Sequence, residues 1–235
     1  MKKLRWSYWS ILGLAMAVLL TASPAMALTL TDVGVSWSNP QGAAVGTVTY
    51  PTTGSGNSTT WQVRWGVPKP PDGYPADQAG LGFDPAFPPS SLPDGTFILG
   101  TLWHYNNQIN SLNGGLNSVD LTLTPHFDNG QYAEWKYRAL IDETHNNFPP
   151  GPPGCCDDFI TLVALDASPL IFTHDGEEYR WTPLGIDPAS LQSPELSNNY
   201  APFWVTTVPN PSPLLLIGLG LVGLAGVSRL SAHRK

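Results

Sequence analysis

Basic side chains are scarce in this chain. It has 11 Lys and Arg in 235 residues, and only five of them lie between Leu28 and Thr207, where all 18 Asp and Glu also lie. The net charge of that segment, 5 − 18, is therefore −13 with His neutral. Phosphate binding requires clustered Lys and Arg, so the composition argues against nucleic acid as a partner. Divalent cations or a neutral polymer fit it better.

Cysteine is nearly absent, and the only two cysteines are the adjacent Cys155 and Cys156. Without a third cysteine, an intrachain disulfide would have to be a strained vicinal one. In an oxidising compartment, three states stay open: a vicinal disulfide, intermolecular pairing or free thiols.

Catalytic motifs are absent as well. The chain has no Gly-x-Ser-x-Gly, no His-Glu-x-x-His and no phosphate-cradling glycine loop. The adjacent carboxylates Asp142 and Glu143 would point to opposite faces of a strand, which is wrong for two groups that flank one glycosidic bond. We therefore expect no enzyme, with a secreted hydrolase as the least favoured alternative.

Long apolar runs occur only at the two ends. The first begins after the basic residues of 2–5, covers 11–20, and is followed by the small residues Ala25 and Ala27. These are the three regions of a secretory signal peptide, with cleavage expected after Ala27. The sequence thus predicts a signal peptide over 1–27 and an exported domain over 28–207.

The C-terminal segment 208–235 also has three parts. They are the motif Val208, Pro209, Asn210 and Pro211, the apolar run Leu214–Val227, and the basic end Arg229–Lys235. As a helix the apolar run would be about 21 Å long, which is short of the ~30 Å hydrocarbon core of a bilayer. The basic ends should stay in the cytoplasm, so that the domain between them lies outside.

This tail resembles the PEP-CTERM sorting signal of bacteria with an outer membrane, although Asn210 stands where that family has Glu. The resemblance implies recognition by an exosortase, a membrane protease or transpeptidase, which would cut near Pro209 to Pro211. The N-terminal signal peptide in turn predicts earlier handling by the secretion machinery and signal peptidase. The protein would be anchored transiently in the inner membrane by the short C-terminal transmembrane helix, and would then reach the cell surface or extracellular matrix. An ordinary anchor that is never cut is the alternative.

The exported segment shows the alternation of short β-strands, most clearly at Tyr132–Asp142, where apolar and polar side chains alternate. We expect about nine antiparallel strands in a β-sandwich of jelly-roll-like type. Phe159–Leu165 should be a central strand covered on both sides, and Gly46–Tyr50 a further strand. The Pro/Gly-rich Val67–Pro93 is expected to be a loop, and Ser190–Tyr200 a polar linker or last loop.

A second resemblance lies within this domain. The run Leu99–Asn106, with His104 and Asn106, is followed later by Glu143, Thr144 and Asn146. This pattern is similar to that of the choice-of-anchor K and THxN groups of PEP-CTERM proteins, with Trp103 where the naming Thr would stand. The resemblance spans roughly residues 45–187 and implies sorting, with no activity attached.

The sequence leaves open whether the protein binds a metal ion. His104 is expected to be a buried, hydrogen-bonded structural residue. The oxygen ligands of Asp142, Glu143, Asp157 and Asp158 suit Ca²⁺ and lie near strand ends. No Asp-x-Asp-x-Asp-Gly loop accompanies them, so we expect no cofactor and keep Ca²⁺ as the alternative.

Nine Trp suggest a role for aromatic side chains. Trp37, Trp103, Tyr105 and Trp181 would have to be exposed to stack on sugar rings, whereas burial of tryptophans between two sheets is the commoner explanation and the one that we favour. The sequence as a whole predicts a noncatalytic structural or adhesive protein of the cell envelope or extracellular matrix. An exopolysaccharide-binding module is the alternative function.

Overall fold

The structure is a computed structural model of the whole chain. It describes residues 29–54, 59–69, 77–86, 95–110, 115–143, 157–174 and 177–210. Most of them belong to one compact unit, Leu28–Phe172 with Tyr179–Asn210. Several predicted features lie outside the described residues: Ala25, Ala27, Thr144, Asn146, Cys155, Cys156, Pro211 and the tail helix.

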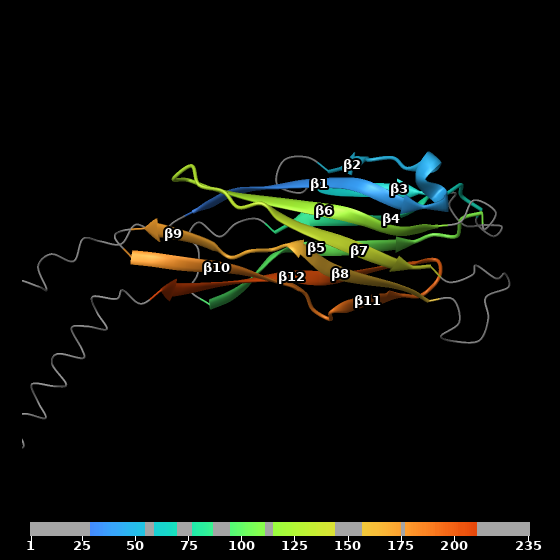
Figure 1. Cartoon of the computed structure of the whole chain (residues 1–235). Helices are drawn as coiled ribbons and strands as arrows, with labels where there is room; N and C mark the ends of the chain where they lie inside the picture. The colour runs from blue at the N-terminus through green and yellow to red at the C-terminus, as the bar shows by residue number, and fades with distance from the viewer. Residues whose placement is uncertain are drawn as a thin grey trace, which may run out of the picture. The chain divides into compact units, whose positions relative to one another are not determined.

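The described residues form twelve β-strands and one short 3-10 helix (Figure 1). In chain order they are β1 (Leu30–Gly42), η1 (Ala43–Thr47), β2 (Thr52–Thr53), β3 (Thr60–Trp65), β4 (Ala79–Pro85), β5 (Gly95–Asn106), β6 (Leu116–Phe127), β7 (Trp135–Asp142), β8 (Asp158–Asp166), β9 (Leu170–His174), β10 (Glu177–Ile186), β11 (Ser190–Ser193) and β12 (Ser197–Asn210). The prediction of an all-β fold is confirmed.

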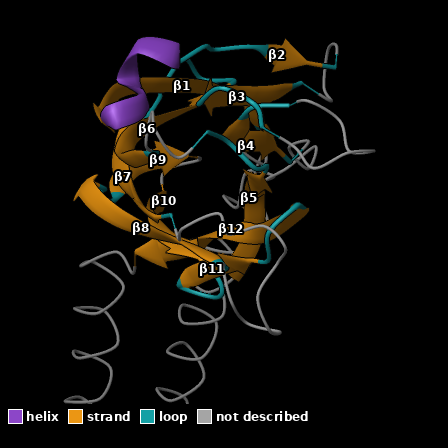
Figure 2. Ribbon diagram, turned by 90° about the vertical axis from the view of Figure 1, so that its right-hand side faces the viewer, coloured by secondary structure: helices purple, strands orange, loops and turns teal. Residues whose placement is uncertain are grey.

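The strands form two antiparallel sheets. The five-stranded sheet has the order β1-β6-β7-β8-β11, and the seven-stranded sheet has the order β2-β3-β4-β5-β12-β10-β9. Figure 2 shows β1, β6, β7 and β8 on one side and β3, β4, β5 and β12 on the other. The arrangement is sandwich-like, with one core between the sheets.

Period-2 alternation builds this core. Along β7, the side chains of Trp135, Tyr137 and Ile141 are buried, whereas those of Lys136 and Asp142 are exposed, as the sequence predicts. The buried rings reach the other sheet: the centroid of Tyr137 lies 5.3 Å from that of Phe203 on β12, edge to face. Such contacts between rings hold the two sheets face to face.

Four predictions about strands are wrong. Gly46–Tyr50 overlaps η1 and contributes only an isolated bridge at Thr49. Val67–Pro93 contains the buried strand β4, and Ser190–Tyr200 contains β11 and the start of β12. Phe159–Leu165 is not covered on both sides, because its second half is exposed.

The first three residues of the predicted sorting motif, 208–210, are the end of β12.

Candidate functional site

The motif residues of β5 divide between its two faces. His104 and Asn106 are fully buried between the sheets, while Trp103 and Tyr105 are half-buried on the outer face. The Asn106 Nδ2 donates a hydrogen bond of 2.8 Å to the carbonyl oxygen of Ser193 on β11. Since β5 and β11 belong to different sheets, this bond ties the two sheets together at one end.

Glu143 joins the same end of the sandwich-like unit. Its carboxylate accepts a hydrogen bond of 2.5 Å from Nε1 of the fully buried Trp65. It also lies against Gly115, where a Cβ atom would overlap the carboxylate. Burial raises the pKa of Glu143 to about 7, the bond from Trp65 opposes this rise, and the charge of Asp158 adds to it. The motif residue Glu143 thus lies in hydrogen-bond contact with a core tryptophan.

Glu195, which the sequence does not single out, shares this environment. Burial raises its pKa to about 7, and the charges of Asp158 and Glu143 add to the rise. Asp158 is itself buried and stands opposite Ser193 in the pairing of β8 with β11. We call Trp65, Asn106, Glu143, Asp158, Ser193 and Glu195 the polar end cluster. Glu195 could not be found from the sequence because Ser190–Tyr200 reads as a linker.

The predicted calcium ligands are only partly brought together. Asp142 is exposed on the outer face of β7. Glu143 and Asp158 both belong to the polar end cluster, where the charge of Asp158 raises the pKa of Glu143. Asp157 accepts a hydrogen bond of 2.6 Å from Nε2 of Gln192. Among the described residues, no three His, Cys, Asp or Glu side chains are grouped so that they could hold a metal ion.

His104 is buried, as predicted, but the predicted hydrogen bonds are missing. Neither ring nitrogen has a partner among the described residues. Burial lowers the pKa of His104 to about 4, so the ring is neutral at neutral pH.

Two of the four aromatic residues considered for sugar binding are core residues, which confirms the favoured prediction of burial and rules out the stacking alternative for them. Trp37 is 8% exposed, and its Nε1 donates a hydrogen bond of 3.0 Å to the carbonyl oxygen of Trp61. Trp181 is fully buried against Trp135, with ring centroids 4.8 Å apart. Both tryptophans fill the space between the sheets.

Trp103 and Tyr105 do lie on the outer face of the seven-stranded sheet, and a third aromatic residue joins them. Tyr200 on β12 stands directly opposite Trp103, and their ring centroids are 4.9 Å apart. Tyr200 is 58% exposed. The sequence reading missed it because Tyr200 ends the segment that was expected to be a linker.

Glycines on β4 create the space for this row of rings. A Cβ atom on Gly82 would stand 3.0 Å from the ring of Tyr105, and one on Gly80 would overlap the side chain of Arg64. The Cζ of Arg64 lies 3.6 Å from the centroid of the Tyr105 ring, which is the geometry of a cation–π contact. Because Gly80 and Gly82 have no side chains, the side chains of Tyr105 and Arg64 can lie across β4.

A hollow lies further along the same face. It has a volume of about 340 Å³ and is lined by Thr96, Leu184, Gly185, Ile186, Asp187 and Trp204. Trp204 lies four residues after Tyr200 on β12, so their side chains point to the same side of the sheet. The pairing of β12 with β5 has one register irregularity, between Phe203 and Trp204. We call Trp103, Tyr105, Tyr200 and this hollow the aromatic face.

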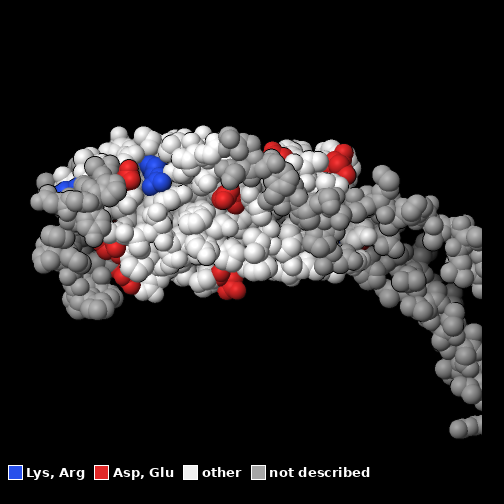
Figure 3. Space-filling view, turned by 180° about the vertical axis from the view of Figure 1, so that it is seen from behind, with Lys and Arg blue, Asp and Glu red and all other residues white. Residues whose placement is uncertain are grey.

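The aromatic face carries few charges. In Figure 1, β4 and β5 lie behind β6 and β7, and Figure 3 shows the molecule from that rear side. The described surface there is mostly uncharged, with isolated acidic and basic groups.

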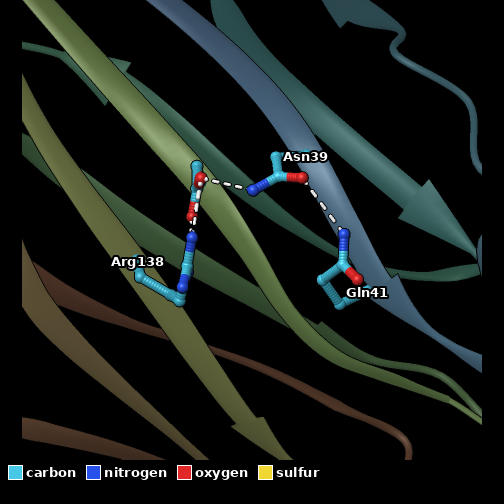
Figure 4. Close-up of polar contacts among 4 residues, drawn as sticks. Asn39, Gln41 and Arg138 are labelled. Atoms are coloured by element: carbon cyan, nitrogen blue, oxygen red, sulfur yellow. Dashed lines mark hydrogen bonds and ion pairs between the residues drawn. The ribbon is translucent and has the colours of Figure 1, made fainter.

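The outer face of the five-stranded sheet is different, because it carries a bonded polar network (Figure 4). Arg138 Nε lies 2.7 Å from Oδ1 of Asp120, and Asn39 Nδ2 donates to Oδ2 of the same carboxylate at 2.9 Å. Gln41 in turn donates to Asn39. These bonds lower the pKa of Asp120, the bond from Arg138 first, and leave the carboxylate satisfied within the sheet.

No protein-family model matches this chain, and no curated protein is similar to it.

The described residues include no helix of the length and apolar character that crossing a membrane requires.

Proposed function

We propose that this protein is exported to the cell envelope or extracellular matrix and adheres there, without catalysis, to a polysaccharide. The aromatic face carries the proposal, above all the row formed by Tyr105, Trp103 and Tyr200. Neighbouring rings on adjacent strands present an apolar platform of the kind on which sugar rings stack.

Polar groups beside the rings support the same ligand class. Arg64 stands against Tyr105, while Thr96 and Asp187 line the hollow next to Trp204. A sugar ring has an apolar face for the indole and hydroxyl groups for such donors and acceptors. The charge of −13 between Leu28 and Thr207 favours a neutral polymer over a polyanion.

Delivery completes the proposal. The signal-peptide pattern and the PEP-CTERM-like tail support export and sorting by an exosortase-like protease, and the jelly-roll variant of the sandwich belongs to the same prediction. β12 ends at Asn210. Cleavage near Pro209 to Pro211 would therefore leave nearly all of this strand with the released domain.

The noncatalytic role rests on the polar end cluster. Its carboxyl group at Glu143 is engaged by Trp65 and buried against Gly115, which suits a structural role. A calcium ion at Glu143 and Asp158 stays the alternative for this cluster.

Trp103→Ala should weaken binding to a neutral polysaccharide by about tenfold, because removal of one stacking ring costs roughly 1 kcal/mol or more. Affinity electrophoresis would measure it, with gels that contain the exopolysaccharide of the source bacterium or a neutral glucan. Trp61→Ala is the matched control, since Trp61 is partly exposed but pairs with the core-facing Phe83 and lies away from the aromatic face.

The proposal fails if the wild-type protein binds none of these polymers, or if Trp103→Ala and Trp61→Ala reduce binding equally. A loss of binding after Glu143→Gln, with Trp103→Ala neutral, would instead favour a hydrolase site in the polar end cluster.

A further inference from the structure

A continuous strip of side chains joins the row of rings to the hollow of the aromatic face. The strip lies on β5 and β12, which are neighbours in the seven-stranded sheet (Figure 2). Ala201, Phe203 and Val205 on β12 are fully buried in the core, so the residues between them point outward. We give the name β5–β12 strip to three outward-facing cross-strand pairs, namely Trp103 with Tyr200, Thr101 with Pro202, and Ile98 with Trp204.

The β5–β12 strip is accessible and uncharged. Tyr200 and Ile98, at opposite ends of it, are both exposed, and none of its six side chains carries a charge. The Nε1 of Trp204 is buried and has no partner among the described residues, so the accessible part of this residue does not include its N–H group. A surface of rings, a proline and short side chains suits the apolar faces of a neutral sugar chain.

The two ends of the strip are too far apart for a single sugar ring. Tyr200 and Trp204 are four residues apart on β12, which corresponds to about 13 Å along a strand. At the first end Trp103 lies 4.9 Å from Tyr200, and at the second end Trp204 lines the hollow together with the exposed Leu184. A ligand that contacts both ends must therefore be an oligosaccharide that lies along the strands.

Polar groups flank the strip along its length. Arg64 lies beside the row of rings at the first end. Asp84 on β4 is half-buried and stands opposite Thr101, between the two ends. Thr96 and Asp187 line the hollow at the second end. The hydroxyl groups of a sugar chain would thus have hydrogen-bond partners at both ends and between them.

We propose that the β5–β12 strip binds several consecutive units of an extended, neutral polysaccharide chain, which runs along the two strands from the row of rings to the hollow. This inference rests on the proposed polysaccharide binding and adds the direction and the minimum length of the ligand. Contacts at the two ends of the strip reinforce each other, because a chain held at one end is present at high effective concentration at the other. Affinity should therefore rise with chain length until a fragment reaches from Tyr200 to Trp204.

Fragments of the polysaccharide that the protein binds in affinity gels test this length dependence. They are prepared by partial acid hydrolysis, sorted by length and titrated into the full chain in detergent by isothermal titration calorimetry. The hexasaccharide should bind at least about tenfold more tightly than the disaccharide. Equal affinities of the two fragments, with binding of the polymer intact, would overturn the extended site and leave the proposed function standing. Absence of binding to any polysaccharide would overturn both.

Trp204→Leu tests the second end of the strip, since it removes the ring at the hollow and keeps an apolar side chain. It should lower the affinity for the hexasaccharide by about fivefold to tenfold. The affinity for the disaccharide should fall less, because this fragment can still use the rings of Trp103 and Tyr200. A melting curve checks that the variant is folded.

Tyr132→Ala is the matched control for Trp204→Leu. Tyr132 is 60% exposed and lies against His126 of β6, which belongs to the other sheet, so its removal should leave both affinities unchanged. An equal loss for both fragments in Trp204→Leu, or no loss for the hexasaccharide, would overturn the extended site. So would binding to neutral phosphatidylcholine vesicles that Trp204→Leu abolishes, if the hexasaccharide does not compete with the vesicles.

Discussion

Trp181→Ala should lower the free energy of unfolding by about 3–5 kcal/mol, the usual cost of removing a large aromatic side chain from a core. Trp181 is fully buried, and its ring centroid lies 4.8 Å from that of Trp135 and 5.0 Å from that of Phe127. It also stacks on Phe97 of its own sheet at 6.0 Å. The indole thus fills the space between the two sheets. Urea unfolding would measure the loss from the shift of the midpoint.

Trp61→Ala is the control for this experiment, because Trp61 is 39% exposed and its removal should cost clearly less stability than the removal of the fully buried Trp181. The comparison separates the two roles that the sequence allows for Trp181. A sugar-binding tryptophan would lose affinity and keep stability. A near-normal unfolding midpoint for Trp181→Ala would contradict its place in the core.

Glu143→Gln should stabilise the protein at pH 8 by about 2 kcal/mol and change little at pH 4.5. Burial raises the pKa of Glu143 to about 7 from its ordinary value of 4.5. Between these values the unfolded chain has lost the proton that the folded chain keeps, so stability falls as the pH rises from about 4.5 to 7 and is then constant. Each unit of difference is worth about 1.4 kcal/mol, reduced by solvent screening. Gln keeps an oxygen that can accept the bond from Trp65.

Two neighbours affect this pH profile and can be separated. Glu195 has a pKa of about 7 for the same reason, so Glu143→Gln/Glu195→Gln should flatten the profile further. His104 acts in the opposite direction: its pKa of about 4 makes the fold lose stability as the pH falls from 6.5 towards 4.

Urea titrations at pH 4.5, 6 and 8 would resolve these contributions, with the exposed Asp142→Asn as the control. An equal gain for Glu143→Gln at all three pH values would contradict the buried, protonated carboxyl group.

Local sequence patterns were sufficient to predict a strand wherever one of its faces is exposed to solvent and the other is buried. β7 shows this best, because Trp135, Tyr137 and Ile141 are buried and Lys136 is exposed, as period-2 pleating requires. The turn before it also follows from local chemistry, since Gly130 adopts a φ of 80°, which glycine tolerates at little cost. The all-β class needed no tertiary information.

Strands of unusual composition were missed. β4 has glycines at positions 80 and 82 and lies in a proline-rich stretch, so its local propensity indicates a loop. Those glycines are required by the side chains of Tyr105 and Arg64, which come from the strands on either side. A sequence pattern contains no record of such a neighbour. For the same reason Tyr200 was read as part of a linker, although its register with Trp103 makes it part of the aromatic face.

The sequence by itself determined the acidic charge, the signals at the two ends as predictions, the β class and the alternation of the regular strands, because each of these depends on composition or on residues close in the chain. Only the tertiary structure decided which aromatic side chains are buried and which form a face. It also brought Trp65, Glu143 and Glu195 into one polar end cluster. These features depend on which strands become neighbours, and strand pairing joins residues whose separation in the chain has no local signature.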